Sequence, residues 1–196
     1  MPNPQQEPNS STGLLPFPHY RLSRLQEKHG HRPVLATFNL INGAISIALI
    51  AALALVTQEA LIFPSLGATA FILFYAPLAE PASPRNTFLG HLIGAIAGFL
   101  SLALFGLLDA PSAVANGVDA ARVGAAALSL GTCGALMILL RSPHPPAGAT
   151  AMIVSLGLMP HPGQFPILMA GVALLVGQAF VMNRLAGIAY PIWRSR

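Results

Sequence analysis

Four long apolar stretches dominate this sequence and limit the folds that it can adopt. They cover residues 36–56, 87–108, 120–140 and 165–181, and each approaches the roughly 20 residues that a helix needs to cross the hydrocarbon core of a bilayer. Charged residues make up 8% of the chain, against about 25% in ordinary soluble domains. Because so few charges cannot cover a soluble surface, the sequence predicts an all-α, polytopic membrane bundle.

The basic residues are concentrated at the two ends of the chain. Those before the first apolar stretch are Arg21, Arg24, Lys28 and Arg32, and those after the last are Arg184, Arg194 and Arg196. Basic flanks are typical of the cytoplasmic ends of membrane proteins, which predicts a multi-pass protein of the cell inner (plasma) membrane with a cytoplasmic N-terminus. The chain has no basic stripe with interleaved aromatic residues, which argues against a nucleic-acid partner.

Composition divides the chain into three parts. Residues 1–33 are rich in Pro, Asn, Gln and Ser, and we expect a polar, basic cytoplasmic tail that is partly disordered. Residues 34–186 form the predicted transmembrane domain, and residues 187–196 form a basic C-terminal tail.

Two shorter apolar stretches, residues 66–79 and 148–159, each follow a segment that contains proline. The motif FPSLGATA at residues 63–70 returns as HPPAGATA at residues 144–151, with an offset of 81 positions. Regular helices of this length are too short to span a bilayer. We therefore predict a proline-broken short helix at each copy of the motif.

The same offset of 81 pairs Gly43 with Gly124 and Gly90 with Gly171, on either side of the motif. An internal repeat of this kind predicts two copies of one structural unit. Each unit would contain a long helix, a proline-broken short helix and a second long helix, over residues 34–108 and 115–186.

Two topologies fit these six segments. If the short segments cross the membrane, the halves form a 3+3 inverted repeat; otherwise there are four spans and two re-entrant segments. The positive-inside rule favours six segments, because Arg85 and Arg141 then join both termini in the cytoplasm and only Arg122 lies outside.

The repeated motif predicts an anion-binding site. Non-helical backbone within a membrane is tolerated where it is buried in protein or lines a cavity, and the free N–H groups at a helix N-terminus attract anions. The predicted binding residues are Ser65, Gly67, Ala68 and Thr69 in the first motif and His144, Pro145, Gly148, Ala149 and Thr150 in the second. Close helix packing by small residues is the alternative interpretation. His144 either caps its helix, which is the favoured interpretation, or accepts a proton and adds positive charge near the anion.

The other polar positions within the apolar stretches have two interpretations each. His91 should face protein, either as a proton-relay residue or as a hydrogen-bonded interior histidine. Asn42 and Gln178 either line a pathway or bond between helices. The ridge GxxxGxxxG at residues 90–98 provides close helix contact, either within the bundle or between the protomers of a homo-oligomer.

Catalysis and cofactors find little support in the sequence. It lacks a P-loop, a GxSxG motif and an HExxH motif, and Cys133 is the one cysteine. We therefore expect a protein that is not an enzyme and has no metal or other cofactor.

Three segments resemble a known family. SPHPPAGATA at residues 142–151, FPSLGATA at residues 63–70 and SPRNTFLGHLIGAIAGF at residues 83–99 are similar to motifs of the HPP family of integral membrane proteins, named for a His-Pro-Pro triplet. The resemblance covers about residues 31–185. It implies a bundle usually described with four membrane helices, the rival of the six-segment count.

Members of the HPP family in chloroplast envelopes and cyanobacteria are similar to nitrite transporters, so the resemblance implies a small oxyanion as substrate. The expected partners are therefore a small inorganic anion, most simply nitrite, and the lipid bilayer. The alternative function is that of a membrane sensor or assembly subunit that does not transport and recruits a partner through its basic tail.

Overall fold

The structure is a computed structural model that describes residues 22–58 and 62–195, and this part of the chain is all-helical. Four of its helices are long and apolar enough to cross a membrane, which confirms the four long stretches. They are α2 (His31–Thr57), α4 (Pro84–Leu104), α6 (Ala120–Leu139) and α8 (Phe165–Leu185). The shorter elements are α1 (Leu22–His29), α3 (Pro64–Tyr75), η2 (Glu80–Ala82), α5 (Ala113–Asn116), α7 (Pro146–Ser155) and η3 (Pro162–Gln164).

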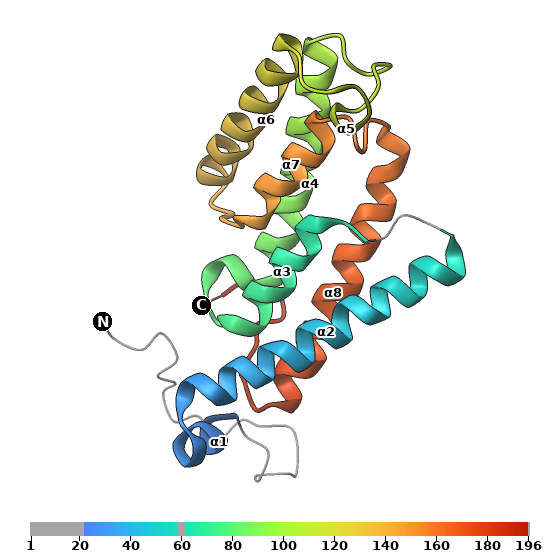
Figure 1. Ribbon diagram of the computed structural model, residues 1–196. Coiled ribbons are helices and arrows are strands. Elements are labelled where there is room, and N and C mark those ends of the chain that lie inside the picture. Colours follow the sequence, from blue (N-terminus) through green and yellow to red (C-terminus); the bar gives the residue numbers. More distant parts are fainter. Residues whose placement is uncertain (1–21, 59–61, 196) are drawn as a thin grey trace.

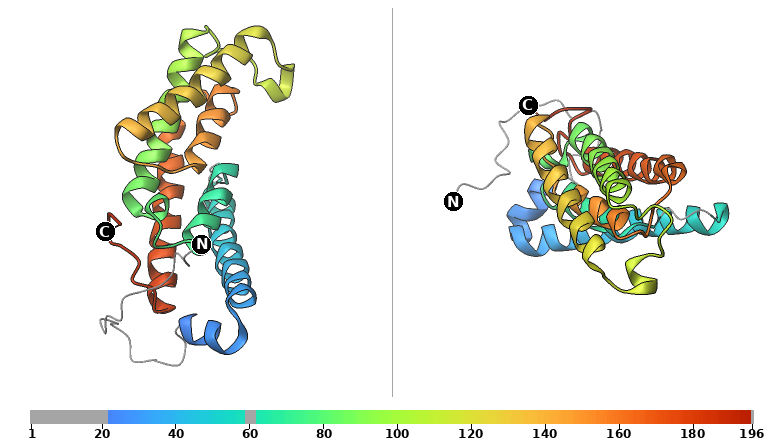
Figure 2. Two further views of the ribbon diagram at one scale, coloured as in Figure 1. Left: turned by 90° about the vertical axis from the view of Figure 1, so that its left-hand side faces the viewer. Right: turned by 90° about the horizontal axis from the view of Figure 1, so that it is seen from above.

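The two short apolar helices lie with different long helices. The pair α2 and α3 packs with α8 and the pair α6 and α7 packs with α4, while α4 and α8 also contact each other (Figures 1 and 2). The bounds of α4 and α8 differ by 81 residues, the offset of the repeated motif, and the two helices run in opposite directions (Figure 1). The 3+3 inverted arrangement and its re-entrant alternative remain predictions.

Proline begins both short helices, as the repeated motif predicts. Pro64 follows Phe63 in an extended conformation, and Pro146 opens α7. Proline suits the first turn because the N–H that it lacks would have no intrahelical partner there. Neither helix has a side chain that caps its N-terminus. Backbone groups alone therefore cap these two helix starts.

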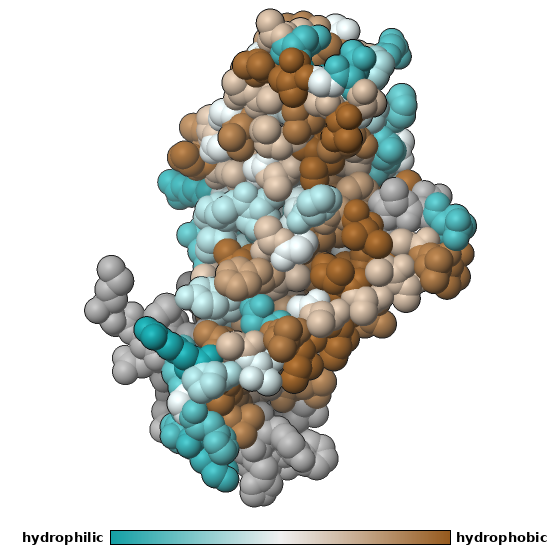
Figure 3. Space-filling view, in the orientation of Figure 1, coloured by the Kyte–Doolittle hydropathy of each residue, from teal (hydrophilic) through white to brown (hydrophobic). Residues whose placement is uncertain are grey.

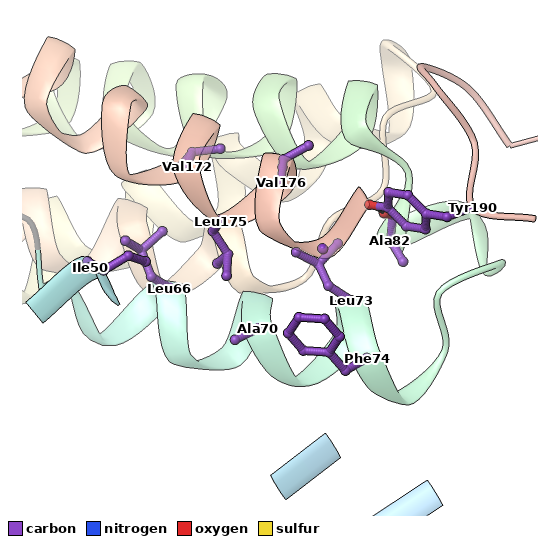
Figure 4. Close-up of a cluster of buried hydrophobic side chains, with 11 residues drawn as sticks. Ile50, Leu66, Ala70, Leu73, Phe74, Ala82, Val172, Leu175, Val176 and Tyr190 are labelled. Atoms are coloured by element: carbon purple, nitrogen blue, oxygen red, sulfur yellow. Dashed lines mark hydrogen bonds between the residues drawn. The ribbon is translucent and has the colours of Figure 1, made fainter. Parts of the chain in front are cut away.

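The largest hydrophobic cluster holds α3 between α2 and α8 (Figure 4). Leu73 and Phe74 of α3 are fully buried and lie in one cluster with Leu175 of α8 and Ile50 of α2. Tyr190, beyond the end of α8, closes this cluster (Figure 4). The burial of these large side chains fixes α3 firmly, so the residues at its first turn have defined positions.

The glycine ridge of α4 packs against α7. A Cβ added at Gly90 would lie 2.6 Å from the Cβ of His144, and one at Gly98 would lie 2.6 Å from the Cβ of Val154. At Gly94 the nearest atom would be a backbone carbonyl oxygen of α7, at 2.5 Å. Because real Cβ atoms do not approach so closely, only glycine allows this contact. The ridge therefore acts within the bundle, one of the two expected roles.

The segment at residues 187–195 folds back onto the start of α4. The hydroxyl of Tyr190 donates to the carbonyl of Ala82 at 2.6 Å, and the backbone N–H of Arg85 donates to the carbonyl of Trp193 at 2.9 Å. The sequence sets this segment apart as a tail, whereas the structure attaches it to the bundle. Of the N-terminal tail, residues 1–21 and their expected disorder lie outside the described residues.

The exposed face has a large hydrophobic area between polar ends. Brown surface extends over α2 and the right-hand side above it, while teal residues gather over α1 and at the top, and a paler, more polar band lies on the left of the middle (Figure 3). Leu40 and Leu55 of α2 and Ile138 of α6 are each more than 70% exposed. Such surface would be unfavourable in water and suits contact with lipid.

Candidate functional site

Four polar side chains meet where α3, α4 and α7 come together. They are Thr69 of α3, His91 of α4, His144 just before α7, and Thr150 of α7, and each residue is 0% exposed. The two imidazole rings have their centroids 5.0 Å apart. We call this group the Thr–His cluster. In an otherwise apolar bundle, buried polar groups need partners, so their contacts matter.

The Thr–His cluster is a chain of short hydrogen bonds. Oγ1 of Thr69 lies 2.8 Å from Nε2 of His91 and 3.1 Å from Nε2 of His144. Nδ1 of His91 lies 2.7 Å from Oγ1 of Thr150. At the other end, Nδ1 of His144 lies 2.7 Å from the carbonyl oxygen of Pro81 in η2. All four ring nitrogens therefore have a partner.

With both rings neutral, one arrangement of hydrogens gives every ring nitrogen of this chain a partner. A carbonyl only accepts, so Nδ1 of His144 carries the hydrogen and its Nε2 accepts from the Thr69 hydroxyl. Thr69 Oγ1 then accepts from Nε2–H of His91, whose Nδ1 accepts from the Thr150 hydroxyl. The bonds run in one direction, from Thr150 to Pro81, and the two histidines are opposite tautomers.

Local sequence explains this convergence. Thr69 and Thr150 occupy equivalent positions of the repeated motif, each close to the start of its short helix. His91 follows Gly90 on α4, and the missing Cβ of Gly90 lets His144 approach the helix backbone. The repeat thus supplies the hydroxyl groups from two helices, and the glycine ridge supplies the space for the second imidazole.

The remaining predicted binding residues differ in exposure: one is buried and most of the others are exposed. Ser65 is buried, and its hydroxyl has no hydrogen-bond partner among the described residues. The small residues of the two motifs are turned away from the Thr–His cluster or lie at its edge. Gly67, Ala68, Pro145 and Ala149 are exposed, and Gly148 is half-buried. The structure brings the polar members of the predicted site together and leaves most of the small ones on the surface.

The structure also gives the contacts of three positions for which the sequence left a second interpretation. His144 does not cap α7, because its ring bonds to Thr69 and Pro81 and the N-cap residue is Pro145. Asn42 donates to the carbonyl of Phe38 within α2. Both amide atoms of Gln178 are buried without a partner among the described residues. Of the proposed pathway residues, His91 alone belongs to the Thr–His cluster.

A polar surface pocket of about 280 Å³ lies beside the Pro81 end of the cluster. Its lining comes from both ends of η2, from the start of α4, from the end of α6 and from the C-terminal segment. The lining residues are Glu80, Ser83, Arg85, Asn86, Leu140, Arg141, Arg194 and Ser195. Arg85 donates to the carbonyls of Leu140 and Arg141. We call it the arginine pocket, since three arginines outnumber its single carboxylate.

Neither the Pro81 carbonyl nor the arginine pocket is predicted by the sequence. A backbone acceptor has no side-chain signal, and the pocket joins residues more than a hundred positions apart. Among the described residues, no group of three or more His, Cys, Asp or Glu side chains could hold a metal ion. The chemistry that this site offers is hydrogen bonding and proton exchange.

Comparison with known proteins identifies the family. The family model described as the HPP transmembrane region matches residues 28–191. The chain belongs to the HPP family. The match covers the bundle from the end of α1 into the C-terminal segment, so it includes the whole Thr–His cluster and all of the arginine pocket except Arg194 and Ser195.

Two transmembrane proteins of Dictyostelium discoideum are similar to this HPP protein. One is 30% identical over 145 residues, which is 71% of this chain and 47% of the relative. The other is 37% identical over 89 residues, which is 45% of this chain and 25% of the relative. The chain thus spans about half or less of these curated relatives. No solved structure matches it.

Proposed function

We propose that this HPP protein transports a small inorganic anion, with nitrite as the first candidate, across the cell inner (plasma) membrane with its N-terminus in the cytoplasm. It does so as a carrier or a channel, not as an enzyme, and needs no cofactor. One observation carries the proposal: Thr69 and Thr150, from the two proline-started short helices, both bond to His91.

The convergence of the second turns of two short helices on one buried point suits an anion. No side chain caps either start, where the N–H groups of Leu66, Ala147 and Gly148 donate to backbone carbonyls, and each start carries the positive end of a helix dipole. Ser65 adds a buried hydroxyl without a partner among the described residues. The sequences of α3 and α7 contain no acidic residue, so neither short helix brings a negative charge that would repel the ligand.

In this structure the Thr–His cluster is closed to a ligand. Its hydroxyl and imidazole groups bond to one another, so an anion can bind only when α3 and α7 separate. Each short helix is packed with different long neighbours, α3 with α2 and α8, and α7 with α4 and α6. Movement of one group against the other would open the site, as in transporters built from two repeats.

The arginine pocket supports the same function at the surface. Arg141 and Arg194 line it and lie near the Pro81 end of the Thr–His cluster. A pocket with an excess of positive charge raises the local concentration of anions. This would favour anion capture next to the point at which the two halves of the bundle meet.

Nitrite uptake into proteoliposomes tests the proposal. We expect uptake above that of protein-free liposomes, and a loss of most of it in Thr69→Val and Thr150→Val. Thr37→Val is the matched control, because Thr37 is exposed on α2 and its hydroxyl bonds only within that helix. Full nitrite uptake by both cluster variants would remove the site from the mechanism, and no uptake by the wild type would refute transport of nitrite.

A further inference from the structure

The Thr–His cluster has a property that anion transport alone does not require: it can hold one extra proton without losing a hydrogen bond. We propose that Nε2 of His144 takes up a proton together with each monovalent anion, so that the protein is an electroneutral proton–anion symporter. The inference rests on the proposed function and adds its coupling ion.

The hydrogen bonds of Thr69 provide for both protonation states. When Nε2 of His144 gains a proton it becomes a donor, so the Thr69 hydroxyl can no longer donate to it. The carbonyl of Ser65 lies 3.0 Å from Thr69 Oγ1 and accepts the hydroxyl hydrogen instead. Oγ1 then accepts from both histidines, using its two lone pairs. One hydroxyl rotates, and no ring nitrogen loses its partner.

The protonated state lacks a counter-charge among the described residues around it. The titratable group that faces His144 is His91 of α4. Helices α3 and α7 have no acidic or basic residue. On the other packed elements, Glu80 of η2 and Arg85 of α4 line the arginine pocket. No carboxylate therefore stands ready to neutralise the new imidazolium.

A buried charge without a partner is strongly unfavourable, so proton uptake at His144 requires an anion. The anion in turn binds more tightly when the positive charge is present, since coupling between two ligands is reciprocal. One H⁺ and one anion thus enter the site together and leave together. His144 returns to its neutral tautomer on release, and no covalent bond other than N–H changes.

Nitrite uptake into wild-type proteoliposomes under imposed gradients tests the coupling. With the uptake of protein-free liposomes subtracted, a tenfold proton gradient should concentrate nitrite about tenfold on the alkaline side, because each anion crosses together with one proton. A membrane potential set with valinomycin and K⁺ should not change this accumulation. Accumulation that follows the potential and ignores the pH gradient would overturn the symport and leave the transport function standing. Absence of any nitrite flux would refute both.

The variant His144→Asn tests the residue. Asparagine retains an N–H for the Pro81 carbonyl and cannot be protonated, so gradient-driven accumulation should fall to the level of protein-free liposomes. His29→Asn is the matched control, because His29 is exposed on α1, and it should behave as the wild type. Accumulation by His144→Asn equal to that of the control would overturn the assignment of the proton to His144.

Proton uptake by the wild-type protein in detergent gives a measurement that does not depend on the folding of a variant. Adding nitrite to the weakly buffered protein should remove about one proton per protein from solution, as the linkage between the two ligands requires. Nitrite binding without proton uptake would overturn the proposal.

Discussion

Replacing Gly94 by alanine tests whether the site depends on the close approach of α4 to α7. A Cβ at Gly94 would lie 2.5 Å from the carbonyl oxygen of Ala147 and 3.2 Å from the Cβ of Thr150. Ordinary contact begins at 3.4 Å, so α7 must move by roughly 0.9 Å at its first turn. Its backbone cannot rotate away as a side chain could.

Overpacking of this kind lowers the free energy of unfolding by about 1–3 kcal/mol. Alanine also favours a helix over glycine by about 1 kcal/mol, which partly offsets the loss. Gly131→Ala on α6 is the matched control, because a Cβ there meets nothing within 4 Å. The helix-propensity gain is common to both variants, so the difference between them isolates the clash and should be about 1–3 kcal/mol.

Labelling of Cys133 can be used to measure the unfolding of both variants. It is the one cysteine of the chain and is 0% exposed, so a thiol-reactive dye reports unfolding in detergent. Gly94→Ala should label at a lower temperature than Gly131→Ala. It should also lose nitrite uptake, since the shift of α7 moves Thr150 from its 2.7 Å contact with His91. Equal melting of the two variants would refute the packing argument.

Three further variants test separate contacts. Thr150→Val leaves buried Nδ1 of His91 without its donor and should lower the free energy of unfolding by about 1–3 kcal/mol; a melting temperature equal to that of Thr150→Ser would contradict this. Burial raises the pKa of Tyr190. The neutral phenol of Tyr190 therefore stabilises the fold below the ordinary phenol pKa, and this stabilisation is lost as the pH rises through the raised pKa. Tyr190→Phe should therefore be less stable at neutral pH, through loss of the bond to Ala82, and should lose less stability in alkali; parallel pH profiles of melting would argue against it. Arg194→Gln should reduce nitrite uptake at low ionic strength and have little effect at high ionic strength, because salt screens exposed charges; an equal loss at both would count against the arginine pocket.

Much of the fold follows from the sequence because apolar length and proline placement act locally. The four long helices and the proline starts of α3 and α7 lie where hydropathy and the repeated motif predict them. The interior position of His91 was also predictable, since three glycines share its helix and lipid is a poor environment for imidazole. These features depend on residues within one helix.

The remaining features depend on how helices rotate and meet, which local patterns do not determine. Gly67 and Ala68 share the motif with Thr69, yet they are exposed while Thr69 is buried. The docking of residues 187–195 depends on the Tyr190 hydroxyl reaching the Ala82 carbonyl, a contact across 108 positions. No periodicity in the sequence encodes such a pairing.

The repeat also explains why the hydrogen-bond chain has a direction. Thr69 and Thr150 are equivalent under the offset of 81, but the positions equivalent to His91 and His144 are Val172 and Phe63. Two threonines alone would form a symmetric pair with no preferred donor. Because each half contributes one histidine at a different place, only His144 reaches the Pro81 carbonyl. The unequal histidines therefore give two equivalent copies of the sequence motif a hydrogen-bond chain that ends at one carbonyl acceptor.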